Sequence, residues 1–218
     1  MNLPKKEDLF DLSHTVAKSL FDGCEEVYYV ITKIKEFIKQ LSDGLGNDYL
    51  EISDGVFVAR DSSISDFATV IGPTIIGHRT ELRPGAYIRG SVIVGDDAVI
   101  GNSCEVKNSL LFDGVQIPHY NYVGDSILGY RVHLGAGAIV SNFRLDRENI
   151  SIKTDGSKIK TPLRKMGALI GDFCEVGCNA VICPGSIIGR NTVVYPLTSV
   201  NGTINIKPIN ESEVRAKI

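Results

Sequence analysis

The sequence is poor in several features that common protein classes require. It has no tryptophan, eight phenylalanines and eight tyrosines in 218 residues, which excludes a core built mainly on aromatic rings. No apolar run approaches the ~18 residues of a membrane span, and no signal-peptide pattern opens the chain. Five cysteines, an odd number, do not form a disulfide framework and indicate the reducing cytoplasm. A net charge of −3 argues against non-specific nucleic-acid binding, so we expect neither a nucleic-acid nor a membrane partner.

Glycine and β-branched aliphatic residues are abundant instead, and the glycines are unevenly distributed. Three of the 22 glycines fall in residues 1–50 and one in 143–166, whereas eighteen fall in 51–140 and 167–202. These residue types favour strands and turns over helices. We therefore expect an N-terminal helical segment over 1–50, a β-domain over 51–205 with a loop insertion at 143–166, and a C-terminal tail over 206–218.

Aliphatic residues recur at every sixth position. From Ile52 to Phe112 eleven consecutive positions of this register are apolar, and the register resumes at Leu128 and again at Ile170. A small residue often stands two positions before the aliphatic one. Glycine often follows it, at Gly77, Gly95, Gly101, Gly129, Gly135, Gly171, Gly177 and Gly189.

A period of six suits very short strands joined by tight turns, with one aliphatic side chain per side pointing inward. The small residue fits where the turn crowds the interior, and glycine fits where the backbone needs conformational freedom. An ordinary β-sandwich with coincidental spacing is the alternative. The pattern resembles the hexapeptide-repeat proteins, whose fold is mainly β, a left-handed parallel β-helix with three hexads per coil. That resemblance implies about seven coils over 52–142 and 167–202.

The N-terminal segment has a different periodicity. Apolar residues from Leu9 to Phe21 and from Val27 to Leu41 follow helical spacing, which predicts a pair of amphipathic α-helices joined near Asp22-Gly23. We expect this pair to pack on the β-helix, most simply as a cap on its end, or on a neighbouring molecule.

The six-residue register is interrupted over 113–127 and again over 143–166, and functional sites are expected where a regular pattern is violated. The first interruption contains His119 within Pro118-His119-Tyr120-Asn121-Tyr122. His14 and His78 lie outside such a cluster and are interpreted as surface or packed residues. For His119 a catalytic and a structural interpretation remain equally open from spacing alone.

The segments around His119 support a closer resemblance. They are similar to the C-terminal acetyltransferase domain of the bifunctional N-acetylglucosamine-1-phosphate uridyltransferase/glucosamine-1-phosphate acetyltransferases, and to archaeal-type sugar-1-phosphate nucleotidylyltransferases. The similarity covers roughly 52–202. The stretches that carry it are Leu82-Arg83-Pro84-Gly85, Glu105-Val106-Lys107, Pro118 to Asp125, Gly135-Ala136-Gly137, Asn142 to Asp146 and Arg164 to Asp172.

The resemblance implies a site that uses acetyl-CoA as co-substrate and an amino-sugar phosphate as acceptor. His119 matches the general base, and an imidazole titrates near neutrality, as removal of a proton from an amine requires. Lys107 and Arg83 match the basic residues that hold the sugar phosphate through charge-assisted bonds. For these two, a solvated surface charge is the alternative.

Three further positions follow from the same match. Tyr122 and Asn142 match residues that contact the amino sugar. Ala136 matches a backbone position near the acetyl group, where an N–H can face a developing oxyanion.

Two departures from the family pattern bear on activity. His133 stands where the bacterial enzymes have an asparagine that touches the sugar, so His133 is retained as a substrate-binding candidate. Glu148 and Ser151 lie where a lysine is expected. The sequence also lacks the glycine-rich nucleotidyltransferase motif, so we expect no nucleotidyltransferase domain.

The insertion at 143–166 is basic. Between Arg144 and Lys165 it has seven basic residues against three acidic ones, and Thr154-Asp155-Gly156-Ser157 predicts a hairpin turn. The positive charge suits coenzyme A phosphates or a sugar phosphate, and Arg164 and Lys165 are the candidate cofactor-binding residues. An exposed, solvated hairpin is the alternative.

A metal site is not expected. Cys174 occupies the small inward position of a hexad, and Cys178 and Cys183 project from other parts of a coil, so all three are interpreted as structural thiols. A γ-class carbonic anhydrase would use this fold with three zinc-bound histidines. The available histidines, His78, His119 and His133, do not have the required spacing.

The resemblance therefore implies a homotrimeric N-acetyltransferase that acts on an amino-sugar phosphate in sugar-nucleotide biosynthesis, and the cysteine content predicts a cytoplasmic location. The alternative is a catalytically inactive module that binds nucleotide sugar or CoA and serves regulation or scaffolding. A third possibility is an acyltransferase for a different amine.

Overall fold

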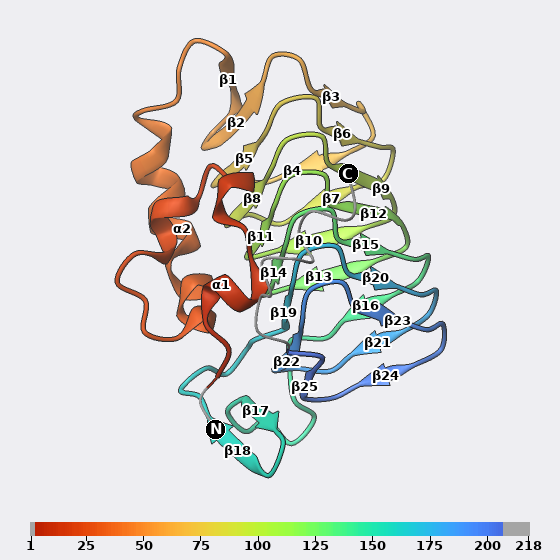
Figure 1. The fold of residues 1–218 in the computed structure, drawn as a ribbon. Coiled ribbons are helices and arrows are strands. Elements are labelled where there is room, and N and C mark those ends of the chain that lie inside the picture. Colours follow the sequence, from red (N-terminus) through yellow and green to blue (C-terminus); the bar gives the residue numbers. More distant parts are fainter. Residues whose placement is uncertain (1–2, 207–218) are drawn as a thin grey trace, which may run out of the picture.

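The computed structural model describes residues 3–206, and the chain winds into a left-handed parallel β-helix with a helical layer on one side (Figure 1). The expected tail at 206–218 lies, apart from Ile206, outside these residues. Three sheets form the sides of the coil, and we name them sheets A, B and C. Each coil passes from sheet A to B to C, so the turns between strands are the A–B, B–C and C–A corners.

The strands are two to five residues long, as a short repeat requires. Sheet A has the order β1 (Tyr49–Ser53), β2 (Val56–Ala59), β5 (Thr74–Ile76), β8 (Val92–Val94), β11 (Ser109–Leu111), β14 (Ile127–Leu128), β19 (Ala168–Ile170), β22 (Ser186–Ile188) and β25 (Thr203–Ile204). Sheet B comprises β3 (Ser63–Ile64), β6 (Glu81–Leu82), β9 (Val99–Asn102), β12 (Gln116–His119), β15 (His133–Leu134), β20 (Glu175–Val176) and β23 (Val193–Val194). Sheet C comprises β4 (Thr69–Val70), β7 (Tyr87–Ile88), β10 (Glu105–Lys107), β13 (Tyr122–Gly124), β16 (Ile139–Val140), β21 (Val181–Ile182) and β24 (Ser199–Val200). Over residues 3–206, β2 to β24 without the hairpin strands make seven complete coils and β25 begins an eighth, which confirms the expected number, while β1 pairs antiparallel with β2.

One aliphatic column fills the interior. Each strand of the coil contributes one inward side chain, and these are almost fully buried from Ile76 to Val200, whereas Ile64 and Val70 in the first coil are only partly buried. Ala98, Cys104, Ala138 and other small residues occupy the crowded corners of the same column, as the hexad pattern predicts. Each buried aliphatic side chain stabilises the fold by about 1.5–3 kcal/mol relative to exposure.

The interruption of the six-residue register over 113–127 is a shift of phase and not a break in the coil. The strands continue through it in register, but the two coils that end at β11 and β14 are one residue shorter than the 18-residue coils before them. Contacts between successive coils join residues 18 apart at His78 and Asp96, and 17 apart at Asn108 and Asp125. Both deletions fall at the C–A corner. Leu111 therefore takes the interior position that the six-residue register assigned to Phe112, and Phe112 faces the helical layer.

The role expected for the repeated glycines also needs correction. None of the eight glycines that follow an aliphatic residue has a positive φ. Each instead lies against the next coil, so that an added Cβ would come within 3.0 Å of its atoms. The left-handed backbone conformation falls mostly on other residues, among them Asp97, Ser103 and Asn108. Close approach between coils, rather than conformational freedom, accounts for this glycine pattern.

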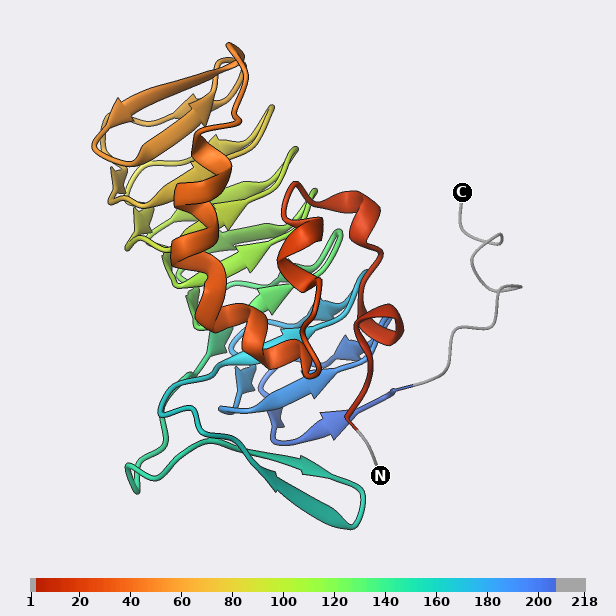
Figure 2. The ribbon, with the colours of Figure 1, turned by 90° about the vertical axis from the view of Figure 1, so that its left-hand side faces the viewer.

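The helical layer covers the outer face of sheet A (Figure 2). Its long helix α2 (Val30–Ser42) packs Ile34 and Ile38 against sheet A, so the layer lies along one side of the coil and does not cap its end as expected. The first predicted helix is shorter than expected. It comprises α1 (Lys6–Leu9) and two 3-10 turns, η1 (Leu12–His14) and η2 (Lys18–Phe21), and a further turn, η3 (Val27–Tyr29), precedes α2.

Tertiary contacts explain why the first helix stops early. The backbone N–H of Asp11 donates to the buried carboxylate of Asp172, and the carbonyl of His14 accepts from the N–H of Asp113. Backbone groups used in this way cannot close an α-helical turn. The segment is therefore attached along the A–B corner as an irregular strap.

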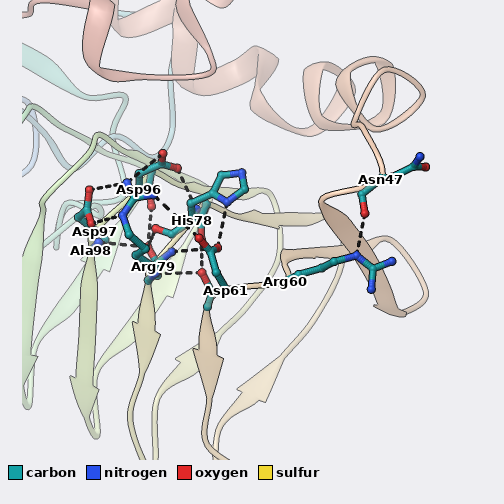
Figure 3. Close-up of polar contacts among 12 residues, drawn as sticks. Asn47, Arg60, Asp61, His78, Arg79, Asp96, Asp97 and Ala98 are labelled. Atoms are coloured by element: carbon teal, nitrogen blue, oxygen red, sulfur yellow. Dashed lines mark hydrogen bonds and ion pairs between the residues drawn. The ribbon is translucent and has the colours of Figure 1, made fainter.

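The A–B corner also carries a polar ladder (Figure 3). The carboxylate of Asp96 accepts from the N–H of His78 at 2.8 Å, and Arg79 pairs with Asp97 at 2.6 Å. The His78 ring contacts Asp61 at 2.9 Å. The guanidinium of Arg79 lowers the pKa of Asp97. These contacts join successive coils.

The insertion forms the predicted hairpin, β17 (Ser151–Thr154) and β18 (Ser157–Lys160), with Asp155-Gly156 as its turn. It projects beyond the last coils (Figure 2). Ile150 and Ile152 are fully buried at the base of the hairpin, whereas the lysines of its two strands are exposed. No helix within residues 3–206 has the length and apolar character needed to span a bilayer.

Candidate functional site

Three polar residues stack at the shortened C–A corner. Asn108, Asp125 and Asn142 occupy equivalent positions of successive coils, 17 residues apart. The Asn108 amide donates to Asp125 at 2.7 Å, and the Asn142 amide donates to the other carboxylate oxygen. Asn108 and Asp125 have positive φ values of 44° and 48°, which asparagine and aspartate tolerate better than most residues. Asparagine and aspartate therefore suit the left-handed backbone of the shortened C–A corner.

Two predicted substrate-binding residues lie beside this stack. The ammonium of Lys107, at the end of β10, is 3.9 Å from the Asp125 carboxylate. The Tyr122 phenol lies against the Asn142 amide, and burial raises the pKa of Tyr122, which the negative charge of Asp125 raises further. Tyr122 is therefore a protonated hydrogen-bond donor near neutral pH. The structure brings Lys107, Tyr122 and Asn142 together.

His119 and Ala136 lie at the neighbouring B–C corner. His119 ends β12 on the outer surface, three residues before Tyr122. The N–H of Gly137 donates to the His119 carbonyl at 3.0 Å, which places the Gly135-Ala136-Gly137 segment directly against His119 in the next coil. Within residues 3–206 the Ala136 N–H makes no hydrogen bond, while its carbonyl accepts from Asn179 at 2.9 Å.

Arg83 and His133 are placed apart from the Lys107 group. Arg83 follows β6, two coils before His119, and pairs with Glu81 at 3.0 Å. His133 lies on the outer face of sheet B, where its ring contacts Glu175 at 2.9 Å. It lines a shallow hollow with Asp97, Gly114, Gln116, Arg131 and Glu175.

Arg164 and Lys165 are exposed at the end of the insertion. The next residue, Met166, donates its N–H to the carbonyl of Asn142 at 3.0 Å. The insertion therefore leaves the β-helix after Asn142 and returns beside it, so its two terminal basic residues are anchored at the same corner.

The remaining histidines and cysteines occupy separate places. His14 stacks on Tyr130 with ring centroids 3.6 Å apart, and His78 lies on the A–B corner. Cys174 fills the predicted inward position, and burial raises its pKa to about 12. Cys178 is exposed and Cys183 half-buried. Within residues 3–206, no three His, Cys, Asp or Glu side chains converge in an arrangement that could hold a metal ion.

The sequence interpretation gave no role to Asn108 and Asp125, although the structure places both at the centre of the polar group. A search for polar residues at a spacing of 17 would have found the set 108, 125 and 142. It also gave no role to Arg89, whose guanidinium pairs with Glu105 at 2.6 Å beside Tyr122 on sheet C.

The fold and its repeat define a left-handed parallel β-helix of the hexapeptide-repeat type. A family model described as the GMPPB C-terminal domain matches residues 70–161. The chain is similar to a bifunctional sugar-1-phosphate nucleotidylyltransferase/acetyltransferase from Sulfurisphaera tokodaii, with 37% identity over 162 residues, 73% of this chain and 40% of the relative. It is also 39% identical over 111 residues to the bifunctional protein GlmU of Methanococcus vannielii, covering 51% of this chain and 27% of the relative. The resemblance inferred from sequence is thus confirmed.

The matches leave most of each relative's length uncovered, since the chain spans 40% or less of these two relatives. Among solved structures, the acetyltransferase domain of PglB from Neisseria gonorrhoeae in complex with acetyl coenzyme A has a TM-score of 0.39 and 15% identity, over 73% of this chain and 64% of that chain.

Proposed function

We propose that this chain transfers an acetyl group from acetyl-CoA to the amine of a sugar phosphate such as glucosamine-1-phosphate. The observation that carries the proposal is the convergence of Lys107, Tyr122 and Asn142 from three successive coils, with His119 at the adjacent corner of the coil that holds Tyr122. A cation, a phenol donor and an amide suit a ligand that combines a phosphate with hydroxyl and amino groups. The names of the relatives, sugar-1-phosphate nucleotidylyltransferase/acetyltransferase among them, agree with this chemistry.

In the proposed reaction His119 is the general base. The amine nitrogen attacks the thioester carbonyl, the new C–N bond forms, and the proton lost by the amine passes to the imidazole. The C–S bond then breaks, and the CoA sulfur leaves and takes up a proton as the thiol. The Ala136 N–H, which is unused within residues 3–206, donates to the carbonyl oxygen as negative charge develops there.

The basic residues have two proposed roles. Lys107 binds the sugar phosphate, and Arg83 contributes to its attraction from the B–C corner. Arg164 and Lys165, anchored beside Asn142, attract the phosphates of CoA.

His133 enters the proposal through a neighbouring copy of the chain. Within one chain it lies on sheet B, whereas Tyr122 lies on sheet C. Because the helical layer covers sheet A, sheets B and C are the sides left for assembly, and we propose that sheet B of one copy faces sheet C of the next. We propose a homotrimer in which His133 completes the acceptor site of the adjacent copy.

The proposal is tested with His119→Ala. Release of the CoA thiol is followed with a thiol reagent in the presence of acetyl-CoA and glucosamine-1-phosphate. We expect a loss of about 10²–10⁴-fold in kcat, the usual contribution of general-base catalysis, with an unchanged circular dichroism spectrum. His78→Ala, on the A–B corner, is the matched control and retains activity. Undiminished turnover by His119→Ala would refute the assignment.

A second candidate is a non-enzymatic module that binds nucleotide sugars. His133 paired with Glu175, and Glu148 and Ser151 where the family has a lysine, favour it. A thermal-shift panel separates the two. Stabilisation by acetyl-CoA supports the enzyme, whereas stabilisation by nucleotide sugars alone supports the module.

A further inference from the structure

A buried carboxylate lies among the residues proposed to hold the acceptor. The Asp125 side chain is 7% exposed, and three groups converge on it. These are the amides of Asn108 and Asn142 and the ammonium of Lys107. All three are donors, and an ionised carboxylate provides acceptors only, so donors and acceptors match.

This arrangement fixes the orientation of one amide. Because Nδ2 of Asn142 is turned toward Asp125, the Oδ1 atom of the same amide is left as an acceptor for a ligand. Gly124 leaves the space that the Asn142 amide and the Tyr122 phenol occupy. A Cβ at position 124 would lie 2.5 Å from both the Asn142 amide nitrogen and the Tyr122 hydroxyl. The shortened corner thus brings amide, phenol and ammonium into one group around a single carboxylate.

We propose that Asp125 is the positioning residue of the acceptor site. It holds the Asn142 amide in the orientation that presents Oδ1 to the amino-sugar phosphate and keeps the Lys107 ammonium beside the site. Asp125 acts through these two residues and does not touch the substrate. This inference rests on the proposed function, because it assigns the acceptor to the Lys107, Tyr122 and Asn142 group.

Asp125→Asn tests the mechanism. An amide offers one acceptor and one donor group to three donors, so one of them loses its partner and Lys107 loses its counter-charge. We expect KM for glucosamine-1-phosphate to rise about 10- to 100-fold, the usual consequence of losing a charged hydrogen bond, whereas kcat and KM for acetyl-CoA stay within about twofold.

Two further variants separate positioning from stability. Asp172→Asn removes a buried carboxylate that pairs with Arg190 at 2.8 Å on the A–B corner, so it lowers the melting temperature but leaves KM unchanged. In the double variant Asp125→Asn/Asn108→Asp, the carboxylate introduced at position 108 accepts from the amide introduced at position 125, and the oxygen of that amide is then free to accept from Asn142. The Asn142 orientation is restored, and KM returns to within about threefold of the unaltered protein.

Calorimetric titration with glucosamine-1-phosphate alone separates the two proposals. If the unaltered protein binds this ligand without turnover, the proposed function fails and Asp125 is judged by Kd in place of KM. A KM or Kd within about twofold of the unaltered protein's for Asp125→Asn, a loss confined to kcat, or no recovery in the double variant overturns the positioning role. Absence of binding by the unaltered protein overturns both proposals.

Discussion

Gly101 and Pro118 lie in adjacent coils so close together that a Cβ on Gly101 would overlap the carbonyl oxygen of Pro118. The obstructing atom belongs to the backbone of a strand, so it cannot move aside as a side chain could. Gly101 does not have a positive φ, and its role is to allow this approach.

We therefore expect Gly101→Ala to destabilise the fold by about 4 kcal/mol or more, because two strands must separate to admit a methyl group. Chemical denaturation measures the effect. Gly46→Ala is the control, since nothing lies within 4 Å of its added Cβ, and its change should stay within about 0.5 kcal/mol. Equal stability of the two variants would contradict the close-approach explanation.

Phe112→Ala should loosen the helical layer and leave the β-helix largely intact. The Phe112 ring is fully buried against Phe10 and Phe21, with centroids 5.2 and 6.1 Å away. Truncation of such a ring costs about 3–5 kcal/mol. Limited proteolysis should then cleave first within the N-terminal segment. Leu111→Ala, which creates a cavity inside the coil, should instead lower the cooperative unfolding midpoint without selective N-terminal cleavage.

The cysteines should react with iodoacetamide in a defined order. Burial raises the pKa of the Cys174 thiol to about 12 and that of Cys104 above its usual value, so both are protonated and shielded at about pH 8. Cys178 is exposed and should be alkylated first. Peptide mass spectrometry of the native protein checks the order. Labelling of Cys174 at the rate of Cys178 would contradict the assignment of Cys174 to the interior.

The proposed homotrimer predicts complementation between inactive variants. If His119 and His133 of one site come from different copies, co-expression of His119→Ala with His133→Ala produces mixed trimers in which some sites carry both histidines. We expect part of the acetyltransferase activity to return in these mixtures, while each variant alone remains impaired. Light scattering measures the mass of the assembly, which should be that of a trimer. Recovery would be absent if both histidines acted from one chain.

The interior of the fold could be predicted from the sequence because one aliphatic residue per side leaves a direct periodic trace, from Val58 through Val200. Which of the residues 111 and 112 faces the interior of the coil could not be predicted. Both Leu111 and Phe112 are apolar, and only the left-handed turn at Asn108 decides which one faces inward. The first helix was overestimated because contacts to Asp172 and Asp113 compete with helical hydrogen bonds.

For the site, residue types and a family resemblance indicated Lys107, Tyr122 and Asn142, and the structure brings these together. They could not indicate Asp125 as the shared partner, because its importance depends on burial and on the stacking of successive coils. They also could not reveal that His133 lies on another sheet, since a six-residue repeat does not by itself distinguish the three sides of the coil.

The C–A corner accommodates changes of chain length that the other two corners do not show. Equivalent residues in successive coils are 18, then 17, then 42 apart as the chain passes this corner, yet the aliphatic column continues without a gap. Such a corner can acquire or lose residues while the rest of the molecule keeps its register. Insertions at this one corner therefore offer related proteins a way to diverge in acceptor preference. A reporter peptide placed between Asp155 and Gly156, at the turn of the hairpin, would leave the β-helix intact.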